Sequence, residues 1–250
     1  MNLSIIKLNS VNSTNIYASQ YAENNKHLLK ESISLFYASE QLNGKGLGTN
    51  KWESNPEENI TFSILFDLAQ LHTKEFFFIN KFFSISILEF VKSIISNKNN
   101  LKIKWPNDIY FENKKIAGIL IENRIEGNYF KYSIAGAGIN INQERFSIDI
   151  PNPISITNIT SLKYDIEVLI NNYSSYFQKW YEIFLTRNYK LLDDIFFENL
   201  YLLNQPSKFI VNNIVIEGII KGVRQNGMLI MDDKNGMTKL YDFKQIKYCI

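Results

Sequence analysis

The sequence predicts an α+β protein, in which a mixed β-sheet carries packed helices and a small β domain follows at the C-terminus. Two observations lead to this fold class. Over residues 1–204, short apolar runs of strand length are interspersed with longer segments whose apolar residues recur every three or four positions, as in a helix. After Gln205-Pro206, only short apolar runs between turn residues remain. We therefore expect a large domain over residues 1–204 and a small one over residues 205–250.

The first two strands are expected on either side of a helix. Leu3 to Leu8 is short and apolar enough for an opening strand, and Asn9 to Thr14 is a polar loop rich in residues that cap helices. A helix follows to about Glu23, and Ile33 to Ala38 is the second strand by the same pattern. Judged by itself, the segment Ser13-Thr14-Asn15 is no more than a helix N-cap.

The second strand leads into a glycine-rich loop that runs from Leu42 to Trp52. Its glycines at positions 44, 46 and 48 alternate with other residues, a spacing that a regular element does not hold cheaply. We expect a mobile loop whose backbone N–H groups can face an anion. A glycine-rich loop alone is also typical of an ordinary protein surface.

The middle of the chain combines a strand with the longest predicted helix. Ile60 to Phe66 is a continuous apolar run of strand length. Residues 75–96 follow with apolar side chains at helical spacing, so one face of this helix should be buried. We interpret this stripe as core packing rather than as a cofactor site. Its members are Ile79, Phe83, Ile87, Phe90 and Ile94.

A β-hairpin is expected after this helix. Leu101 to Lys104 is a strand that leads into the turn Trp105-Pro106-Asn107-Asp108, where the proline fixes one φ angle and disfavours helix before it. Two strand-like runs, Ile109–Phe111 and Ile116–Ile121, then flank a polar turn that contains the pair Lys114-Lys115. Gly118 is expected to interrupt the second run, and a ligand lying against the sheet is one reason for a glycine there.

The rest of the chain supplies another strand, two helices and the small β domain. Residues 129–135 form a strand that ends in Gly136-Ala137-Gly138-Ile139-Asn140. Residues 154–159 are a loop or short strand, and helices follow over residues 166–187 and 189–203. The small domain is expected to contain the apolar runs Phe209–Val211, Ile214–Val223, Met228–Met231 and Thr238–Tyr241.

The composition is that of an ordinary globular protein of a reducing compartment. With 250 residues, 45% of them hydrophobic, the chain can fill a large core. A formal net charge of +2 gives no broad basic field, so nucleic acid is not an expected partner. The single cysteine, Cys249, cannot form an internal disulfide. Neither a signal peptide nor an uninterrupted apolar stretch of about 20 residues is recognisable, so we expect a cytoplasmic protein with no membrane partner.

Several motifs occur together in an order that resembles one family. K-W-P-N-D at residues 104–108 and K-x-x-G-I-L at residues 115–120 resemble the central signature of biotin protein ligases. S-T-N at residues 13–15, the glycine-rich loop and G-A-G-I-N at residues 136–140 lie where that family has related motifs. The resemblance covers essentially the whole chain and implies a class II synthetase-like catalytic domain followed by an SH3-like β-barrel. Because no helix-turn-helix domain is expected before Leu3, the resemblance is to monofunctional ligases without a DNA-binding domain.

This resemblance implies a function and a set of site residues. Biotin protein ligases activate biotin with ATP and transfer it to a lysine of a biotin carboxyl carrier protein. Lys115 takes the main catalytic role, holding the biotin carboxylate and the charge that develops at the α-phosphate, with Lys45 as a second catalytic cation. Asp108 is expected to help place Mg²⁺, which prefers one or two carboxylates plus phosphate oxygens. The residues expected to bind biotin are Ser13, Thr14, Asn15, Gln41, Gly44, Lys45, Gly46, Leu47, Lys115 and Gly118. Those expected to bind ATP or the adenylate are Lys45, Asn50, Trp52, Lys104, Asn107, Asp108, Lys115 and Asn140.

The glycine-rich loop departs from the family pattern. The related loop runs Q-x-x-G-R-G-R with variations, whereas this sequence has Lys45 and Leu47 where arginines are usual. Lysine preserves a positive charge without the bidentate fork of arginine. We therefore predict that this loop holds biotinyl-adenylate less tightly than an arginine-bearing loop does.

Rival interpretations stay open from the sequence. A lipoate or octanoate ligase of the same superfamily has a related fold and also a lysine near its acyl group, although K-W-P-N-D with G-I-L favours biotin. The missing arginines would also suit a non-catalytic module that binds biotin or a partner. Trp105 either lines the biotin site or fills core, and Asn107-Asp108 is equally typical of a plain turn.

Overall fold

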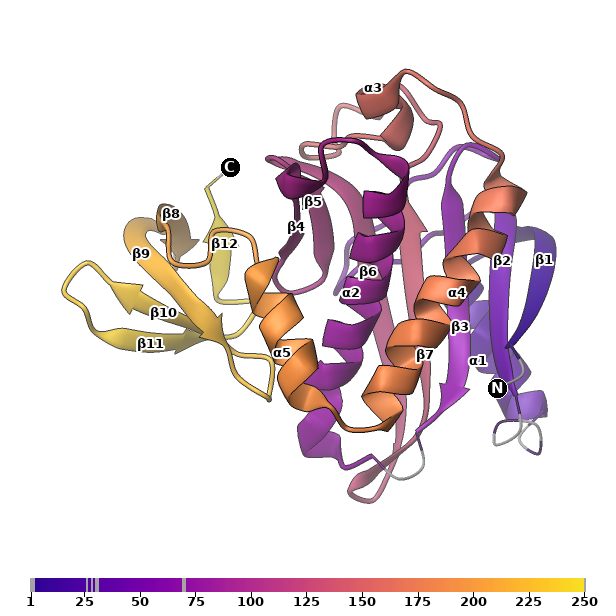
Figure 1. The fold of residues 1–250 in the computed structure, drawn as a ribbon, viewed down its shortest axis with the longest axis horizontal. Helices are drawn as coiled ribbons and strands as arrows, with labels where there is room; N and C mark the ends of the chain where they lie inside the picture. The colour runs from indigo at the N-terminus through magenta and orange to yellow at the C-terminus, as the bar shows by residue number, and fades with distance from the viewer. Residues whose placement is uncertain (1–2, 26, 28, 30–31, 69–70, 250) are drawn as a thin grey trace.

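The computed structural model describes residues 3–25, 27, 29, 32–68 and 71–249 of the chain. These residues form two β-sheets, one of seven strands in the order β1-β2-β3-β7-β6-β5-β4 and one of five in the order β11-β10-β9-β8-β12 (Figure 1). In the large sheet β1 pairs with β2 in parallel and the other pairings are antiparallel, so the predicted mixed sheet is confirmed. Its strands are β1 (Leu3–Val11), β2 (Ile33–Gln41), β3 (Ile60–Asp67), β4 (Leu101–Lys104), β5 (Asp108–Phe111), β6 (Lys114–Glu126) and β7 (Tyr129–Ile139).

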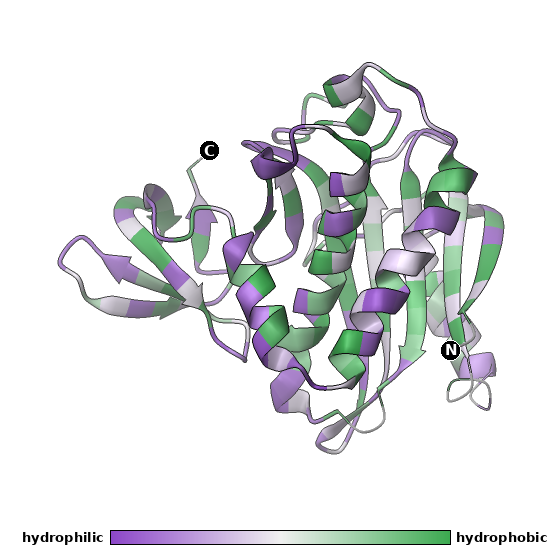
Figure 2. Ribbon diagram, in the orientation of Figure 1, coloured by the Kyte–Doolittle hydropathy of each residue, from purple (hydrophilic) through white to green (hydrophobic). Residues whose placement is uncertain are grey.

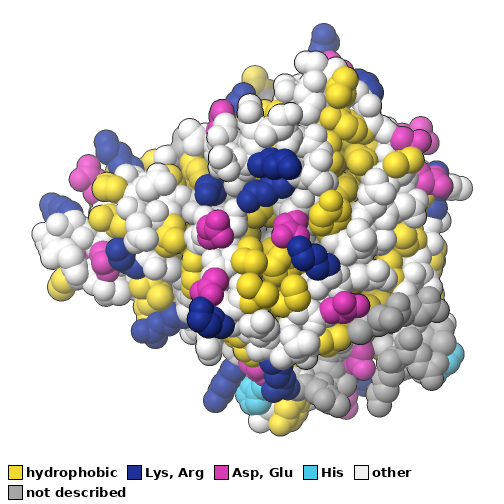
Figure 3. All heavy atoms as spheres, in the orientation of Figure 1, with side chains coloured by type: hydrophobic (Ala, Val, Ile, Leu, Met, Phe, Trp, Pro, Cys, Tyr) yellow, Lys and Arg dark blue, Asp and Glu magenta, His cyan; other side chains and the backbone are white. Residues whose placement is uncertain are grey.

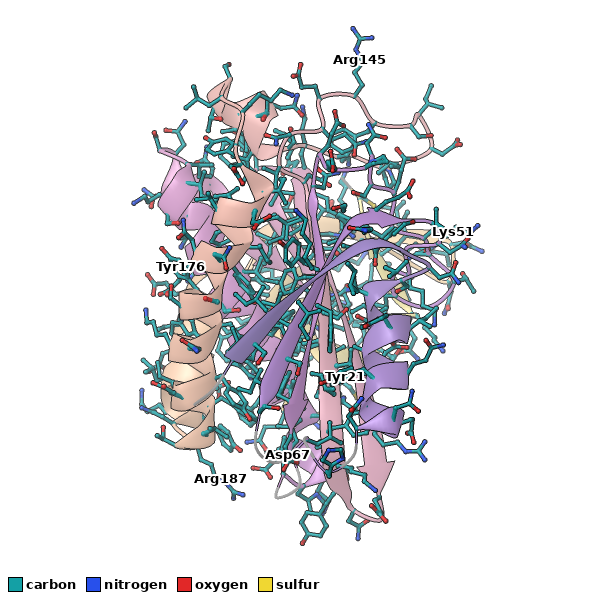
Figure 4. The ribbon with its side chains drawn as sticks, turned by 90° about the vertical axis from the view of Figure 1, so that its right-hand side faces the viewer. Tyr21, Lys51, Asp67, Arg145, Tyr176 and Arg187 are labelled. Carbon is teal, nitrogen blue, oxygen red and sulfur yellow. The ribbon has the colours of Figure 1, made fainter. Side chains whose placement is uncertain are left out.

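Helices cover both faces of the large sheet, as Figure 4 shows from the side. α2 and α4 pack together on one face with α5 beside α2, and α1 lies on the opposite face. Asp165 caps α4, because its carboxylate accepts hydrogen bonds from the N–H groups of Glu167 and Val168. Among the described residues, no helix is both long and apolar enough to cross a membrane. The helices are α1 (Thr14–Asn24), α2 (Phe76–Ile94), α3 (Ile156–Thr160), α4 (Ile166–Leu185) and α5 (Tyr189–Glu198), with 3₁₀ turns η2 (Thr73–Glu75) and η3 (Lys98–Asn100).

Alternate residues of β3 face the two sides of the sheet. Phe62 and Phe66 belong to the main core with α2 and α4, where the ring centroid of Phe62 lies 4.8 Å from that of Tyr173. Leu65 belongs to a smaller core under α1. Ser63 lies between two main-core residues of the strand, so it points to the α1 side of the sheet. Its hydroxyl lies beneath the start of α1 and has no exposed surface. The predicted apolar stripe of α2 is core: Ile79, Phe83, Ile87 and Phe90 are buried, and the helix is hydrophobic over most of its length (Figure 2).

The hairpin after α2 has a tighter turn than predicted. Glu112 adopts a left-handed conformation with φ of 54°, and the turn contains only Glu112 and Asn113. Phe111 already pairs with Lys114, so Lys114 and Lys115 begin β6 instead of forming the turn. The side chain of Lys115 therefore takes its direction from a strand in the middle of the protein.

Glycines do not break the central strands, contrary to the prediction. β6 runs through Gly118, and β7 runs through Gly136 and Gly138 to Ile139. Pairing between the two strands is continuous here, with Gly118 opposite Gly138. These glycines therefore leave space above the sheet rather than ending its strands.

Two segments before the small sheet also differ from the prediction. Residues 156–160 form the short helix α3 rather than a loop or strand, since Ser155 and Asn158 make a reciprocal capping box. α5 ends at Glu198, earlier than expected, because the following residues pair with the edge strand β4. The N–H of Ile103 donates to the carbonyl of Asn199 at 2.8 Å, and the N–H of Tyr201 donates to the carbonyl of Ile103 at 2.9 Å. These bonds satisfy the outer edge of the sheet.

The small sheet begins at Pro206 and contains the predicted strands. Its last strand, Ile246–Tyr248, was not predicted, because three residues are too few for an alternating apolar pattern to be recognised. The indole N–H of Trp105 donates to the carbonyl of Gly227 at 2.9 Å, which joins the turn before β5 to the small sheet. An SH3-like barrel and a boundary at residue 205 stay predictions. The strands are β8 (Pro206–Val211), β9 (Ile214–Val223), β10 (Leu229–Asp233), β11 (Thr238–Tyr241) and β12 (Ile246–Tyr248).

Charged side chains of both signs are interspersed on the face that α2, α4 and α5 present to solvent (Figure 3). The pair Lys190–Asp194 within α5 is exposed. Lys81 of α2 is different: its side chain is 1% exposed, forms an ion pair with Asp193 of α5, and has its ammonium 4.7 Å from the ring centroid of Phe78. Burial lowers the pKa of Lys81 below the usual lysine value.

We expect Asp193→Ala to lower the free energy of unfolding by about 2–4 kcal/mol, because the buried ammonium of Lys81 loses its carboxylate. Asp194→Ala removes only an exposed pair and should change the same quantity by less than about 1 kcal/mol. Denaturant titration measures the free energy of unfolding of both variants, and equal losses would contradict the expected difference.

The folded chain holds the Lys81 proton less tightly than the unfolded chain does, because burial lowers the pKa of Lys81. The free energy of unfolding should therefore rise as pH increases toward 10.5, and Lys81→Met should remove that rise.

Candidate active site

A cavity of about 540 Å³ lies above β6 and β7. Its wall combines the start of α1, the glycine-rich loop, the turn at residues 104–108, the loop at residues 151–152 and the last strand of the small sheet. Segments that are far apart in the sequence therefore meet at one place. Of the predicted site residues, the wall contains Ser13, Thr14, Asn15, Gln41, Lys45, Gly46, Leu47, Asn50, Trp52, Lys104, Asn107, Asp108, Lys115 and Gly118.

Two predicted site residues lie away from the cavity wall. Gly44 packs against the loop itself, where an added Cβ would lie 2.4 Å from the carbonyl oxygen of Trp52. Asn140 is buried, and its amide donates to the carbonyl oxygens of Lys115 at 3.4 Å and Ile154 at 3.1 Å. Asn140 therefore fixes the main chain around Lys115 rather than facing the cavity.

Lys115 is held from both its main chain and its side chain. Its N–H donates to the carbonyl of Asn152 at 2.6 Å, and its carbonyl accepts from the N–H of Ile154 at 3.0 Å. Its ammonium lies 2.7 Å from Oδ1 of Asp108 and 5.6 Å from the ring centroid of Trp52. Lys115 and Asp108 remain 28% and 15% exposed, so the pair borders the cavity and can exchange its partner for a ligand.

The turn that carries Asp108 is fixed to β6 by its neighbour Asn107. The amide of Asn107 donates to the carbonyl of Ile119 at 2.5 Å, and the N–H of Ile119 donates to the carbonyl of Asn107 at 2.8 Å. The plain-turn interpretation thus fits the side chain of Asn107. Asp108 is different, because its buried Oδ1 has the ion pair with Lys115 but no hydrogen bond.

The glycines of β6 and β7 make room for the indole of Trp52. An added Cβ at Gly138 would lie 2.1 Å from Cε2 of Trp52, and one at Gly118 would lie 3.0 Å from Cζ3. The sequence favoured a ligand against this backbone, whereas an aromatic side chain from the glycine-rich loop fills the space. Its Nε1 is buried without a hydrogen-bond partner.

The small sheet contributes part of the wall that sequence reasoning missed. The ammonium of Lys104 lies 4.7 Å from the ring centroid of Tyr110 and 4.6 Å from that of Tyr248 in β12. Burial lowers the pKa of Lys104 and raises that of Tyr248, whose hydroxyl has no hydrogen-bond partner. No local motif in the last residues of the chain marks this contribution. The other residues from this part of the chain on the wall are Phe243, Ile246 and Lys247.

A group of hydroxyls and amides gathers at the start of α1. Ser13 occupies the N-cap position of α1, but its side chain makes no capping hydrogen bond and lines the cavity instead. The N–H of Thr14 donates to Oε1 of Gln41 at 2.8 Å. The amide of Asn15 donates to the carboxylate of Glu122 at 2.7 Å, and Gly136 leaves space for it, since a Cβ there would lie 2.0 Å from Oδ1. Gly136 and Gly138 are two residues apart, so this group lies about 7 Å along the strand from Trp52.

The cavity is positively charged. Among the described residues of its wall are five lysines and one carboxylate, that of Asp108. In the part of the chain that the structure describes, no group of three or more His, Cys, Asp or Glu side chains could hold a metal ion by itself. The cavity therefore suits an anionic ligand, and a metal would need oxygen ligands from that ligand. The lysines are Lys45, Lys51, Lys104, Lys115 and Lys247.

Several proteins are related to this chain in sequence. Biotin–protein ligase 2 of Arabidopsis thaliana is 26% identical over 213 residues, which cover 80% of this chain and 63% of that protein. The bifunctional ligase/repressor BirA of Bacillus spizizenii is 25% identical over 238 residues, which cover 92% of this chain and 70% of that protein. The chain thus spans about two thirds of the length of these relatives.

Solved structures show the same fold. The biotin protein ligase of Aquifex aeolicus, in complex with biotin and ATP, superposes with a TM-score of 0.72 at 22% identity, covering 98% of this chain and 97% of that one. The Leishmania major enzyme with biotinyl-5-AMP gives a TM-score of 0.64 at 20% identity, covering 96% of this chain and 98% of that one. The model of the biotin/lipoate A/B protein ligase family matches residues 8–140, more than half of the sequence. These residues contain the start of α1, the glycine-rich loop, the turn with Asp108 and the strand with Lys115, and the chain belongs to the biotin/lipoate A/B protein ligase family.

Proposed function

We propose that this chain is a biotin protein ligase, which uses ATP to convert biotin to biotinyl-5′-AMP and then transfers biotin to a lysine of a biotin carboxyl carrier protein. One observation carries the proposal: a single cavity joins a lysine-rich region beside Asp108 to a group of hydroxyls and amides around Thr14. The first region suits a nucleotide and a carboxylate, and the second suits a polar, uncharged ring. The names of the relatives and the ligands of the similar structures support this assignment.

In the first step, an oxygen of the biotin carboxylate attacks the α-phosphorus of ATP. A new O–P bond forms, and the bond from phosphorus to pyrophosphate breaks. Two unit negative charges at 4 Å repel by about 4 kcal/mol at an effective dielectric constant of about 20. Lys115 offsets this repulsion, because its ammonium is held at the cavity wall beside Asp108.

In the second step, the amine of the carrier lysine attacks the acyl carbon, an amide bond forms and AMP leaves. The mixed anhydride hydrolyses in water, so the loop from Leu42 to Trp52 has a protective role, with Trp52 covering the backbone of Gly138. The carrier docks transiently, and we assign the reaction to the cytoplasm. Neither nucleic acid nor a membrane takes part.

Asp108 is the residue that would hold Mg²⁺ together with ATP. Its buried Oδ1 has no partner besides the ammonium of Lys115 at 2.7 Å, which would turn to the ligand when Mg²⁺ binds. Mg²⁺ at nucleotide sites uses one or two carboxylates plus phosphate oxygens. The absence of a second carboxylate from the described wall fits a metal that arrives with the nucleotide. The bound ion would neutralise phosphate charge.

The polar group at the start of α1 favours biotin over lipoate. The ureido ring of biotin offers two N–H donors and a carbonyl acceptor, whereas the dithiolane ring of lipoate offers none. Leaving the groups of Ser13, Thr14 and Gln41 unmatched against an apolar ring would cost about 1–3 kcal/mol for each buried polar group.

Exchange of labelled pyrophosphate into ATP tests the proposal, with biotin and lipoate compared in parallel. Biotin-dependent exchange is expected, followed by biotin transfer to a carrier protein. Exchange that occurs with lipoate but not with biotin would assign the chain to the lipoate branch of the family. Binding of biotin with no exchange would indicate a non-catalytic module.

The double variant Lys45→Arg, Leu47→Arg should release biotinyl-5′-AMP more slowly than the parent, by about tenfold. Both residues line the cavity, and a bidentate contact between a guanidinium and phosphate or carboxylate is worth about 1.5 kcal/mol. Most of the gain comes from position 47, because Lys45 already carries a positive charge. Stopped-flow dilution of the preformed complex measures the release rate. Lys114→Arg, at an exposed position off the cavity wall, is the matched control for an added guanidinium. An unchanged rate in the double variant would contradict the idea.

A further inference from the structure

The polar group beside Thr14 contains more oxygen-to-oxygen contacts than protons to fill them. Oγ of Ser63, which is fully buried, lies 2.5 Å from Oδ1 of Asn15 and 2.7 Å from Oγ1 of Thr14. Oγ1 of Thr14 in turn lies 3.1 Å from Oε1 of Gln41. This row of four oxygens contains three short oxygen–oxygen distances, here called gaps, but only the two hydroxyls carry a proton that could form a hydrogen bond across a gap. One gap must therefore lack a proton.

The side-chain amides of Asn15 and Gln41, at the two ends of the row, cannot rotate by 180° to supply the missing proton. The backbone N–H of Thr14 donates to Oε1 of Gln41 at 2.8 Å, which keeps that oxygen in place. Nδ2 of Asn15 donates to the carboxylate of Glu122 at 2.7 Å and to the carbonyl of Leu120 at 3.3 Å. Both of these partners are acceptors only, so both protons of Asn15 are used. The row ends in an amide oxygen on each side.

Ser63 has one proton but two short contacts, to Asn15 and to Thr14. Hydroxyl hydrogen bonds are commonest near 2.7–2.8 Å, and both gaps beside Ser63 are that short or shorter. The gap between Thr14 and Gln41 is the longest. Both short contacts can be hydrogen bonds only if Ser63 donates to Asn15 and Thr14 donates to Ser63. Oγ1 of Thr14 and Oε1 of Gln41 are left as adjacent acceptors on the cavity wall.

We propose that Ser63 is a positioning residue for the ligand's polar ring. It draws the proton of Thr14 away from Gln41, so the wall presents a pair of acceptors to the N–H groups of a cyclic urea. Ser63 is not on the wall itself and acts through Thr14 and Asn15. This inference rests on the proposed function, because the ureido ring of biotin carries two such N–H donors.

Ser63→Ala tests the proposal by removing the acceptor for the Thr14 proton. That proton then turns to Gln41, and the pair of free acceptors is lost. We expect biotin to bind at least about tenfold more weakly by isothermal titration calorimetry, while KM for ATP changes by less than about twofold. Ser133→Ala is the matched control, because Ser133 is equally buried in the same sheet, donates to Asn123 at 2.7 Å and lies off the wall. Its biotin affinity should equal that of the wild type.

A biotin derivative methylated on one ureido nitrogen separates positioning from a general loosening of the site. The wild type should prefer biotin to this derivative strongly, and Ser63→Ala should lose most of that preference. Ser63→Cys keeps a weaker acceptor for the Thr14 proton and a weaker donor, so it should give an intermediate affinity. It also serves as the test variant if the alanine variant does not fold.

The outcomes for this proposal and for the proposed function are distinct. Wild-type affinity and preference in Ser63→Ala would overturn the role of Ser63 and leave the ligase assignment standing. A wild-type protein that binds biotin but shows no pyrophosphate exchange would overturn only the ligase assignment. A wild-type protein that does not bind biotin would overturn both.

Discussion

Lys115→Ala should reduce biotin-dependent exchange of pyrophosphate into ATP by about 100- to 1,000-fold with the fold intact. Its ammonium borders the cavity 2.7 Å from Asp108, and the main chain on both sides of it is fixed by the loop at residues 152–154. Lys104 is not expected to take over that position, because its ammonium is enclosed between two tyrosine rings. The loss should appear in kcat, since the interaction strengthens as charge develops at the α-phosphate.

Lys114→Ala is the control for this variant. Lys114 is the preceding residue of the same strand, is exposed and does not line the cavity. Its removal changes net charge by the same amount, so exchange should stay near the wild-type rate. Circular dichroism and thermal melting of both variants check the fold. Wild-type exchange in Lys115→Ala would remove Lys115 from the mechanism.

Gly138→Ala should reduce the same exchange by about 100-fold, because a displacement of about 1 Å in a positioned group costs about that factor. The added methyl would lie 2.1 Å from the indole of Trp52, and β7 cannot move away while it pairs with β3 and β6. The indole must leave its place over the sheet, and the glycine-rich loop moves with it. A rise in Trp52 fluorescence quenching by acrylamide should accompany the loss of activity.

Gly118→Ala places a methyl group at the neighbouring glycine and should reduce exchange less than Gly138→Ala does. There the methyl would meet the flexible end of Lys115 and the edge of Trp52 at 3.0 Å, so small adjustments relieve the contact. We expect a loss of less than about tenfold for this variant. A double variant, Trp52→Ala with Gly138→Ala, should be no worse than Trp52→Ala alone if the indole is the cause. Additive losses would show that Gly138 acts through another contact.

The local pattern of the sequence was enough to predict most elements. Apolar runs such as Ile60–Phe66 and the stripe of α2 specify strand or helix within one segment, because burial of alternate or every third and fourth residue is a local requirement. The errors lie where a distant partner decides. α5 stops at Glu198 since the next residues pair with β4, and β6 begins at Lys114 since Phe111 pairs there.

Motif order was likewise enough to select residues of which fourteen out of sixteen lie on the cavity wall, including Lys115, Asp108 and the start of α1. The sequence by itself thus determined the fold class, the family resemblance and the candidate cation. Only the tertiary structure decided that Trp52 fills the space left by two glycines, that Tyr248 closes the wall from the small sheet, and that Ser63 lies beneath Thr14. These contacts join residues that are tens to more than a hundred positions apart. Their packing and proton positions depend on atoms from several elements at once, which no local periodicity encodes.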